Sequence, residues 1–188
     1  LSEAIRKDEI SSIILWGLGN EGRHRKAYLR LKQQVRSLDP SRPVIYAENH
    51  AYRARRKHTA GLVDVWGLNY EFDEMDFART AAPTGCVVVT ECANLPYARR
   101  GHLPAEALQV RLIREAVERT ETAGAGSAGW ALWGYADYAT PRHRRWFREC
   151  GVVDGWRTEK MAAVWLRARH AHQPVLHVSG DWSFASGG

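Results

Sequence analysis

The sequence is poor in cysteine and has no long apolar run, and each scarcity excludes a class of protein. Its 188 residues include three cysteines, Cys86, Cys92 and Cys150, too few for a complete disulfide framework and without C-x-x-C spacing. No apolar run approaches the roughly 18 residues of a membrane span, and no signal peptide is recognisable, which favours a cytoplasmic protein without a membrane partner. The chain begins at Leu1 rather than Met, inside charged, helix-like sequence, which predicts an incomplete domain.

Apolar runs and amphipathic runs alternate along the chain. The apolar runs are short, rich in Val, Ile and Trp, and typical of strands covered on both faces. The predicted strands are 12–17, 43–48, 62–69, 86–91 and 128–135, and the predicted helices are 23–37, 51–59, 73–80, 104–123 and 157–170. Five strands joined by helices predict an α/β protein with a parallel sheet and right-handed crossovers.

Acids, amides and aromatic residues follow the predicted strands. The first run, SSIILWGLGNEG over 11–22, ends in Asn20 and Glu21, and the fourth run ends in Glu91. Two carboxylates at one edge of a parallel sheet suit glycoside hydrolysis, with one as general acid and the other as nucleophile or base. Aromatic rings there offer an apolar floor for a sugar. The glycines of GLGNEG lack G-x-G-x-x-G spacing, which disfavours a dinucleotide site.

Three stretches of the chain resemble glycoside hydrolase family 2. SSIILWGLGNE resembles the acid/base signature of that family, although the family usually has Asn and then His, Arg or Tyr where this chain has Glu9 and Ile10. VVVTECAN resembles the strand that carries the nucleophile, and AGWALWGYADY with GVVDGWRTEKMAAVW resembles the last barrel strand, its loop and the closing helix. The resemblance implies an incomplete (β/α)8 TIM barrel, strands four to eight, over 1–172. It also implies that 173–188 open a following β-sandwich.

The same resemblance implies a retaining O-glycoside hydrolase that acts on β-linked sugars and is β-galactosidase-like. In that pattern Glu21 is the acid/base and Glu91 the nucleophile. Asn20 binds the sugar 2-hydroxyl, Tyr70 hydrogen-bonds Glu91, and Trp133 is the floor of the sugar site. A carbohydrate is the expected partner, together with the missing amino-terminal barrel half and sandwich domains of the parent chain. No cofactor and no metal are expected.

Structural alternatives stand beside each of these roles. Glu21 could be a first-turn acid favoured by a helix dipole, Glu91 an exposed strand-end acid, and Tyr70 and Trp133 ordinary packing residues. Glu71 is expected to be a solvated loop acid. For function, the alternative is a catalytically silent carbohydrate-binding fragment, because the first half of the barrel is missing.

The segment PRHRRWFR over 141–148 has the cations and aromatics of a single-strand nucleic-acid surface. It falls beside the predicted sugar site, so no nucleic-acid partner is expected, and an acidic sugar is the other reading. Family members that act on glucuronides carry an Asn-x-Lys motif in this region, and the sequence shows none.

Overall fold

A computed structural model describes residues 13–22, 24–95, 97–124, 126–141 and 146–171. The predicted sandwich strand at 173–188 lies outside these residues. The chain divides into two compact units, which are described separately below. The first unit comprises Leu1–Thr90 with Arg119–Trp130, and the second comprises Glu91–Glu118 with Ala131–Gly188.

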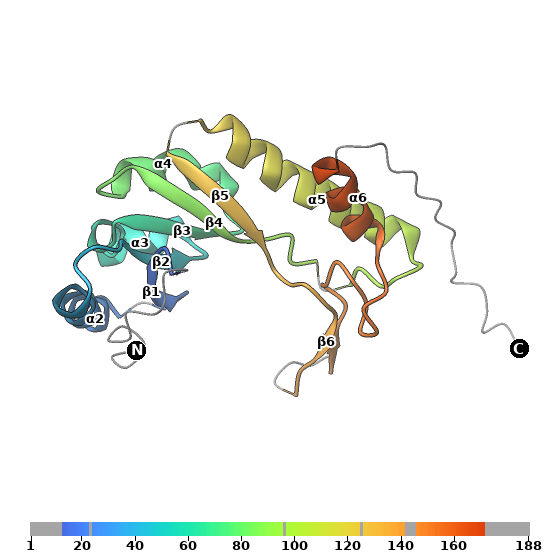
Figure 1. The fold of residues 1–188 in the computed structure, drawn as a ribbon, viewed down its shortest axis with the longest axis horizontal. Helices are drawn as coiled ribbons and strands as arrows, with labels where there is room; N and C mark the ends of the chain where they lie inside the picture. Colours follow the sequence, from blue (N-terminus) through green and yellow to red (C-terminus); the bar gives the residue numbers. More distant parts are fainter. Residues whose placement is uncertain (1–12, 23, 96, 125, 142–145, 172–188) are drawn as a thin grey trace, which may run out of the picture. The chain divides into compact units, whose positions relative to one another are not determined.

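A five-stranded sheet organises the first unit (Figure 1). Its strands follow the order of the sequence: β1 Trp16–Asn20, β2 Val44–Glu48, β3 Val65–Asn69, β4 Cys86–Cys92 and β5 Ser127–Leu132. The pairs β1–β2 and β2–β3 are parallel, with Trp16 opposite Val44 and Ile45 opposite Val65. The predicted α/β fold is therefore confirmed.

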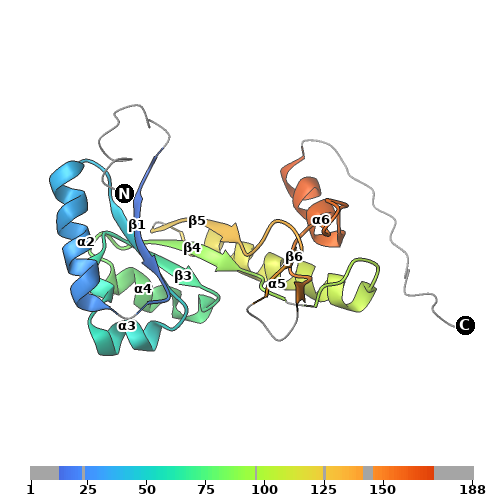
Figure 2. The same ribbon diagram turned by 90° about the horizontal axis from the view of Figure 1, so that it is seen from below.

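Helices connect successive strands. They are α2 Arg25–Leu38, α3 Ala51–Lys57, α4 Met75–Ala81 and α5 Leu103–Thr122, with 3₁₀ turns at Ala60–Leu62 and Phe72–Glu74. Helices α2, α3 and α4 lie on one side of the sheet (Figure 2). Every residue of β2 and β3 is buried, which explains their uninterrupted apolar sequence.

The first strand lies later in the sequence than its apolar run predicts. It was expected at 12–17, but β1 begins at Trp16 and continues to Asn20. Backbone hydrogen bonds fix this position, from Trp16 N–H to Pro43 O (2.9 Å) and from Glu21 N–H to Ala47 O (2.8 Å). The shift places Asn20 in the strand and Glu21 directly after it.

Gly19 and Gly22 of GLGNEG accommodate the ring of Tyr28 in the core between α2 and the sheet. A Cβ at Gly19 would lie 2.7 Å from Tyr28 Cε1, and one at Gly22 would lie 2.2 Å from Tyr28 Oη. Tyr28 is buried with Trp16 and Tyr46 in one apolar cluster. These glycines therefore serve close packing, in agreement with the absence of dinucleotide-site spacing.

Asp39 ties the end of α2 to β1 and makes the first unit sensitive to acid. Its carboxylate accepts hydrogen bonds from the Ser41 hydroxyl (2.5 Å), from Trp16 Nε1 (2.9 Å) and from Arg42 Nη1 (2.6 Å). These bonds hold the pKa of Asp39 well below its usual range, the Ser41 bond most strongly. A carboxyl pKa that is lower in the folded state contributes stability above its unfolded value, near 3.9, and loses that contribution as pH falls.

We predict that Asp39→Asn lowers the thermal unfolding midpoint at pH 7, because the amide cannot replace the charge-assisted bonds. The gap from the parent chain should narrow as pH falls below about 4, because Asp39 then takes up a proton in the unfolded chain while the folded chain still holds it ionised. Thermal unfolding followed by circular dichroism from pH 7 to pH 3 measures this. A gap that stays constant with pH would show that the carboxylate charge is not responsible.

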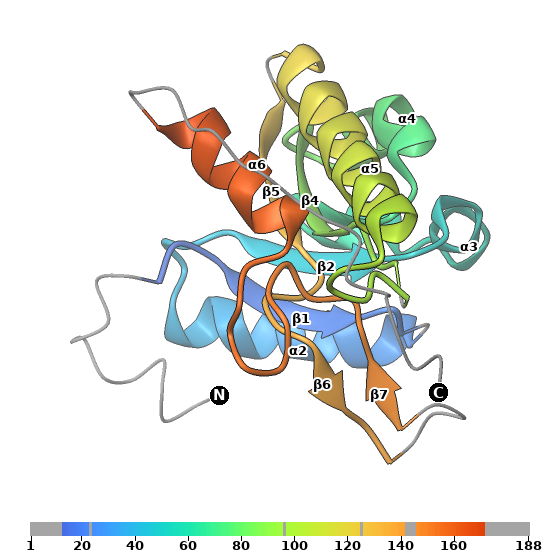
Figure 3. The same cartoon turned by 90° about the vertical axis from the view of Figure 1, so that its right-hand side faces the viewer.

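The second unit contains the loops that follow β4 and β5. A short antiparallel hairpin of β6 Tyr138–Ala139 and β7 Phe147–Arg148, absent from the sequence prediction, precedes helix α6 Met161–His170 (Figure 3). Helix α6 begins four residues later than predicted, because Asp154 Oδ1 holds a turn by accepting from the N–H groups of Trp156 (2.9 Å) and Thr158 (2.8 Å). Among the described residues, no helix is long and apolar enough to cross a membrane.

A buried ion pair fastens these loops together. Lys160 Nζ lies 2.7 Å from Asp137 Oδ1, and their side chains are 0% and 4% exposed. The ammonium also donates to Ala98 O (2.7 Å) and to Glu149 O (3.2 Å), while Asp137 accepts from Gly151 N–H (2.8 Å). Burial raises the pKa of Asp137, and Lys160 opposes that rise. One ammonium group thus joins the loop after β4, the loop after β5 and the start of α6.

Lys160→Met should destabilise the chain by about 3–5 kcal/mol, because it leaves the Asp137 carboxyl buried without its counter-ion. Urea unfolding of the variant and of the parent measures the difference. The double variant Lys160→Met/Asp137→Leu should recover much of the loss, since no charge is then left unpaired. A single variant as stable as the parent would show that the pair does not fasten the loops.

Candidate active site

One buried amide orients the two polar residues at the end of β1. Asn69, the last residue of β3, is fully buried, and its Nδ2 donates to Asn20 Oδ1 and to Glu21 Oε1, each at 2.9 Å. Its own oxygen accepts from Thr90 Oγ1 on β4 at 2.7 Å. Because a carboxylate oxygen only accepts, the end of the Asn69 amide that faces Glu21 is the donor. The bridge therefore sets the orientation of both Asn20 and Glu21.

Three residues that follow the ends of strands have strained backbone conformations. Glu21 after β1, Tyr70 after β3 and Ala93 after β4 have φ values of 50°, 66° and 59°. Non-glycine residues in this left-handed region cost of order 1–3 kcal/mol each and cluster at functional sites. The strain therefore supports the carboxyl edge of the sheet as the functional edge.

Glu48, at the end of β2, has a structural role. Its side chain is buried, accepts a hydrogen bond from the Tyr46 hydroxyl, and receives the N–H groups of Asn49 (3.0 Å) and His50 (3.3 Å). Burial and the nearby Glu48 carboxylate raise the pKa of Tyr46, which stays a neutral donor. The Glu48 carboxylate is therefore hydrogen-bonded by neighbouring residues of the same segment.

Glu71 lies in a loop and is 31% exposed, as expected for a solvated loop acid, but its carboxylate also has specific partners. One of its oxygens lies 2.7 Å from His50 Nδ1, and the other accepts the N–H of Ala51, the first residue of α3, at 2.8 Å. Glu71 therefore satisfies an otherwise unpaired donor at a helix start. Local sequence does not show this role, because the partner lies twenty residues earlier.

In the second unit, the ends of β4 and β5 are held in register beside Glu91. Trp133 N–H donates to Cys92 O at 3.0 Å, and the Trp133–Gly134 peptide bond is cis. The Trp133 side chain is 37% exposed, so the alternative reading of a plain core residue is wrong. Burial raises the pKa of Cys92 to about 12, which keeps its thiol neutral and fits a packing role next to Glu91.

The predicted site residues are thus divided between the units. Asn20, Glu21 and Tyr70 lie in the first unit, where the Asn69 bridge joins the first two, and Glu91 and Trp133 lie in the second. A retaining mechanism requires the two carboxyl groups to be about 5–5.5 Å apart. The separation of the Glu21 and Glu91 carboxyl groups stays a prediction.

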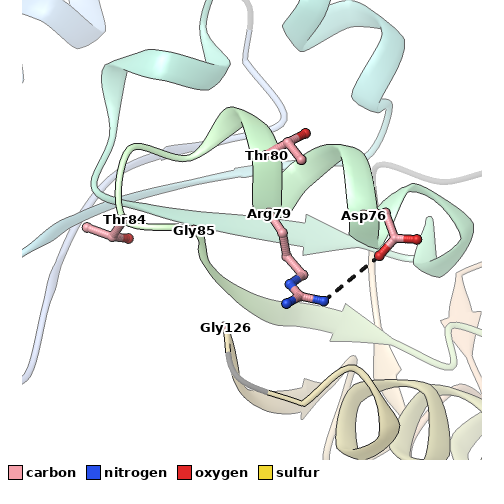
Figure 4. A pocket seen from close by; sticks show the side chains of 6 residues that line it. All are labelled: Asp76, Arg79, Thr80, Thr84, Gly85 and Gly126. Atoms are coloured by element: carbon pink, nitrogen blue, oxygen red, sulfur yellow. Dashed lines mark ion pairs between the residues drawn. The ribbon is translucent and has the colours of Figure 1, made fainter.

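Two pockets of the first unit lie away from this edge. One, of about 590 Å³, is lined by α4 and by residues that precede β4 and β5, including Arg79, whose Nη1 lies 3.9 Å from Asp76 (Figure 4). It therefore adjoins the amino-terminal ends of these strands, a face linked to stability rather than catalysis in barrels. Another, of about 390 Å³, is lined by residues of α2, α3, α4 and the turn Ala60–Leu62. No group of three metal-ligating side chains occurs in the described part of the chain.

A known family model matches the segment that contains Asn20, Glu21 and Asn69. Residues 2–81 match the model of the glycosyl hydrolases family 2, TIM barrel domain. This segment is similar to family 2. The resemblance of SSIILWGLGNE to that family is thereby confirmed. The match includes Asn20, Glu21 and Tyr70, whereas Glu91 and Trp133 lie beyond it.

Solved structures place the fold in the same class. A family 2 β-galacturonidase from Eisenbergiella tayi matches 94% of this chain at 22% identity and a TM-score of 0.70. A β-D-glucuronidase from Dictyoglomus thermophilum matches 92% at 22% identity and a TM-score of 0.68, and one from Ruminococcus gnavus matches 89% at 21% and 0.70. The chain spans about a third of these structures, 37%, 35% and 34% of their lengths. The search of curated proteins gives no match.

The parallel five-stranded sheet therefore matches part of a TIM barrel, as the sequence predicted. Sequence reasoning missed Asn69 as a site residue. The available signal was an amide at the end of the apolar run LVDVWGLN, since a buried amide requires hydrogen-bond partners. Its partners lie 48 and 49 residues away, so the fold was needed to identify them.

Proposed function

We propose that this chain is the carboxyl-terminal part of the barrel of a retaining β-glycosidase and carries both catalytic glutamates. The observation that carries the proposal is the Asn69 bridge, which orients Glu21 and Asn20 within a family 2 barrel segment. Strained backbone at Glu21 and at Tyr70 supports the same edge of the sheet.

The mechanism proceeds in two displacements. The Glu91 carboxylate attacks the anomeric carbon while Glu21 gives its proton to the leaving oxygen, so one C–O bond forms as the glycosidic C–O bond breaks. Glu21, now ionised, takes a proton from water, and the water oxygen displaces Glu91 to release the sugar. Each step inverts the anomeric carbon, so the product keeps the configuration of the substrate.

Three other residues complete the proposed site. Asn20 binds the sugar 2-hydroxyl, a contact that strengthens as positive charge develops at the anomeric carbon. Tyr70 hydrogen-bonds Glu91, and the partly exposed Trp133 ring packs against the sugar.

A β-galactoside is the first candidate substrate, from the resemblance of the sequence. A β-uronide is the second, because the similar structures are described as β-glucuronidases and a β-galacturonidase. Both are β-linked and require the same two glutamates.

Covalent trapping tests the proposal. A panel of 2-deoxy-2-fluoro β-glycosides, galactoside and glucuronide included, is incubated with this chain and with a form extended by the first three barrel strands. We expect mass spectrometry of peptides to locate a glycosyl adduct on Glu91, and the reactive sugar to identify the substrate class. An adduct on the extended form alone would show that the 188 residues are an incomplete catalyst. A folded extended form that reacts with none of the sugars would leave the silent carbohydrate-binding fragment as the better interpretation.

A further inference from the structure

Thr90, on β4, is the last member of a chain of hydrogen bonds that begins at Glu21 and passes through Asn69. Its hydroxyl oxygen lies 2.7 Å from Asn69 Oδ1 and 3.3 Å from Leu68 O. The shorter distance is typical of a hydrogen bond between two oxygens and the longer one is not, so the single hydroxyl proton is donated to Asn69. Glu21, Asn69 and Thr90 all belong to the first unit.

The two ends of the Asn69 amide depend on each other. The two hydrogens of Nδ2 are directed to Asn20 Oδ1 and to Glu21 Oε1, while Oδ1 accepts from Thr90. The Asn69 side chain is fully buried and shielded from solvent. Because the amide is planar and rigid, the Thr90 hydroxyl that holds its oxygen also fixes the position of its nitrogen.

Small residues make room for this chain of bonds on the face of the sheet. A Cβ at Gly67 would lie 2.9 Å from Thr90 Oγ1 and 3.0 Å from Ala47 Cβ, so these three positions face the same side. Asn69, two residues after Gly67 on β3, faces that side as well. Ala47 on β2 lies opposite both Gly67 and Asn20, so only a methyl group lies between Asn69 and β1. A side chain at position 67 would displace the Thr90 hydroxyl.

We propose that Thr90 is a positioning residue of the proposed glycosidase and holds the proton donor Glu21 in place through Asn69. Thr90 itself contacts neither the substrate nor the reacting atoms. It fixes the Asn69 amide, and the amide fixes one carboxyl oxygen of Glu21 and the side-chain oxygen of Asn20. The inference rests on the proposed function for its effect on rate, whereas its effect on the Asn69 bridge is measurable without catalysis.

Thr90→Val replaces the hydroxyl with a methyl group of similar size. The Asn69 oxygen is then buried without a donor, which is unfavourable, so we expect the amide to shift or turn and to release Glu21. A displacement of about 1 Å at a catalytic group can cost about 10²-fold in rate. Thr90→Ser keeps the hydroxyl and should keep the bridge.

Thr80→Val is the matched control, because it makes the same change at another hydrogen-bonded threonine. The Thr80 hydroxyl donates to Phe77 O at 2.9 Å, on helix α4 and outside the bridge. Loss of that bond should leave both Asn69 and the rate unchanged.

Nuclear magnetic resonance of this chain with ¹⁵N-labelled asparagine tests the bridge itself. The chain has four asparagines, Asn20, Asn49, Asn69 and Asn94, so their signals are few enough to assign. We expect Thr90→Val to speed solvent exchange of the Asn69 side-chain hydrogens at least about tenfold, and Thr90→Ser and Thr80→Val to leave it unchanged. Unaltered backbone signals of Asn49 and Asn94 establish that a variant is folded, and Thr90→Ala replaces Thr90→Val if the latter is not. An unchanged Asn69 exchange rate in the variant without the hydroxyl would overturn the proposal.

Rates with two leaving groups test the effect on the acid. In the form that shows the wild-type adduct, Thr90→Val should lower the rate on an alkyl β-glycoside by about 10–100-fold. The loss on a dinitrophenyl β-glycoside should be at least about fivefold smaller, because that leaving group departs without a proton. Equal losses on both would show a role in stability alone and refute the positioning of Glu21. If no form reacts with any sugar, the glycosidase is refuted, and the exchange rate still decides whether Thr90 holds the bridge.

Discussion

Glu91→Gln is expected to reduce hydrolysis of every β-glycoside substrate by at least about 10⁴-fold, because the amide cannot form the covalent intermediate. Initial rates on aryl β-glycosides measure the loss in the form that shows the wild-type adduct. The matched control is Glu118→Gln, which removes an exposed carboxylate on α5 and should leave the rate unchanged.

The product formed with azide tests the role of Glu91 more specifically than the loss of hydrolysis rate does. In Glu91→Ala, azide enters the space of the missing carboxylate and attacks the anomeric carbon in a single displacement. The product is then an α-glycosyl azide, of inverted configuration. Activity that survives in Glu91→Gln, or a β-glycosyl azide from Glu91→Ala, would remove Glu91 as the nucleophile.

Glu21→Ala should lower the rate on an alkyl β-glycoside by about 10²–10⁴-fold, because the poor leaving group then departs without a proton. A dinitrophenyl leaving group needs no protonation, so formation of the glycosyl enzyme should be spared and the intermediate should accumulate. Stopped-flow release of dinitrophenol should therefore show a burst followed by slow turnover.

Azide should restore turnover of Glu21→Ala by attacking the glycosyl enzyme, which gives a β-glycosyl azide of retained configuration. This product is opposite to that expected from Glu91→Ala, so the pair of variants distinguishes the two glutamates. Glu121→Gln, an exposed change on α5, is the control for surface charge. Equal losses on the alkyl and dinitrophenyl substrates would argue against proton donation by Glu21.

The sequence predicted the order of the sheet better than its details. Continuous apolar runs identified β2 and β4 within one residue at each end, because burial on both faces leaves a local signal. The position of β1 depended on hydrogen bonds from Trp16 and Glu21 to the neighbouring strand, which local sequence does not encode. The hairpin of β6 and β7 was missed because two-residue strands have no periodicity.

For the candidate site, motif resemblance supplied the residues, and the structure supplied the relation between two of them, Asn20 and Glu21, through Asn69. Glu21 and Asn20 were predicted from GLGNEG, but nothing near them in sequence indicates Asn69. For Glu71 the sequence predicted a solvated acid and missed its hydrogen-bond partners, which lie at the start of α3. Long-range polar contacts depend on topology, and residue type alone does not specify them.

The Asn69 bridge gives the two oxygens of Glu21 separate tasks. Oε1 accepts the Asn69 amide hydrogen, and Asn69 Oδ1 is directed to Thr90, so a proton on Oε1 would face a donor instead of an acceptor. In the proposed mechanism the proton of Glu21 would therefore lie on Oε2, and Oε1 would keep its bond to Asn69 throughout. Glu21 would pass through a catalytic cycle without turning its carboxyl group, with a single oxygen as both the source and the destination of the proton.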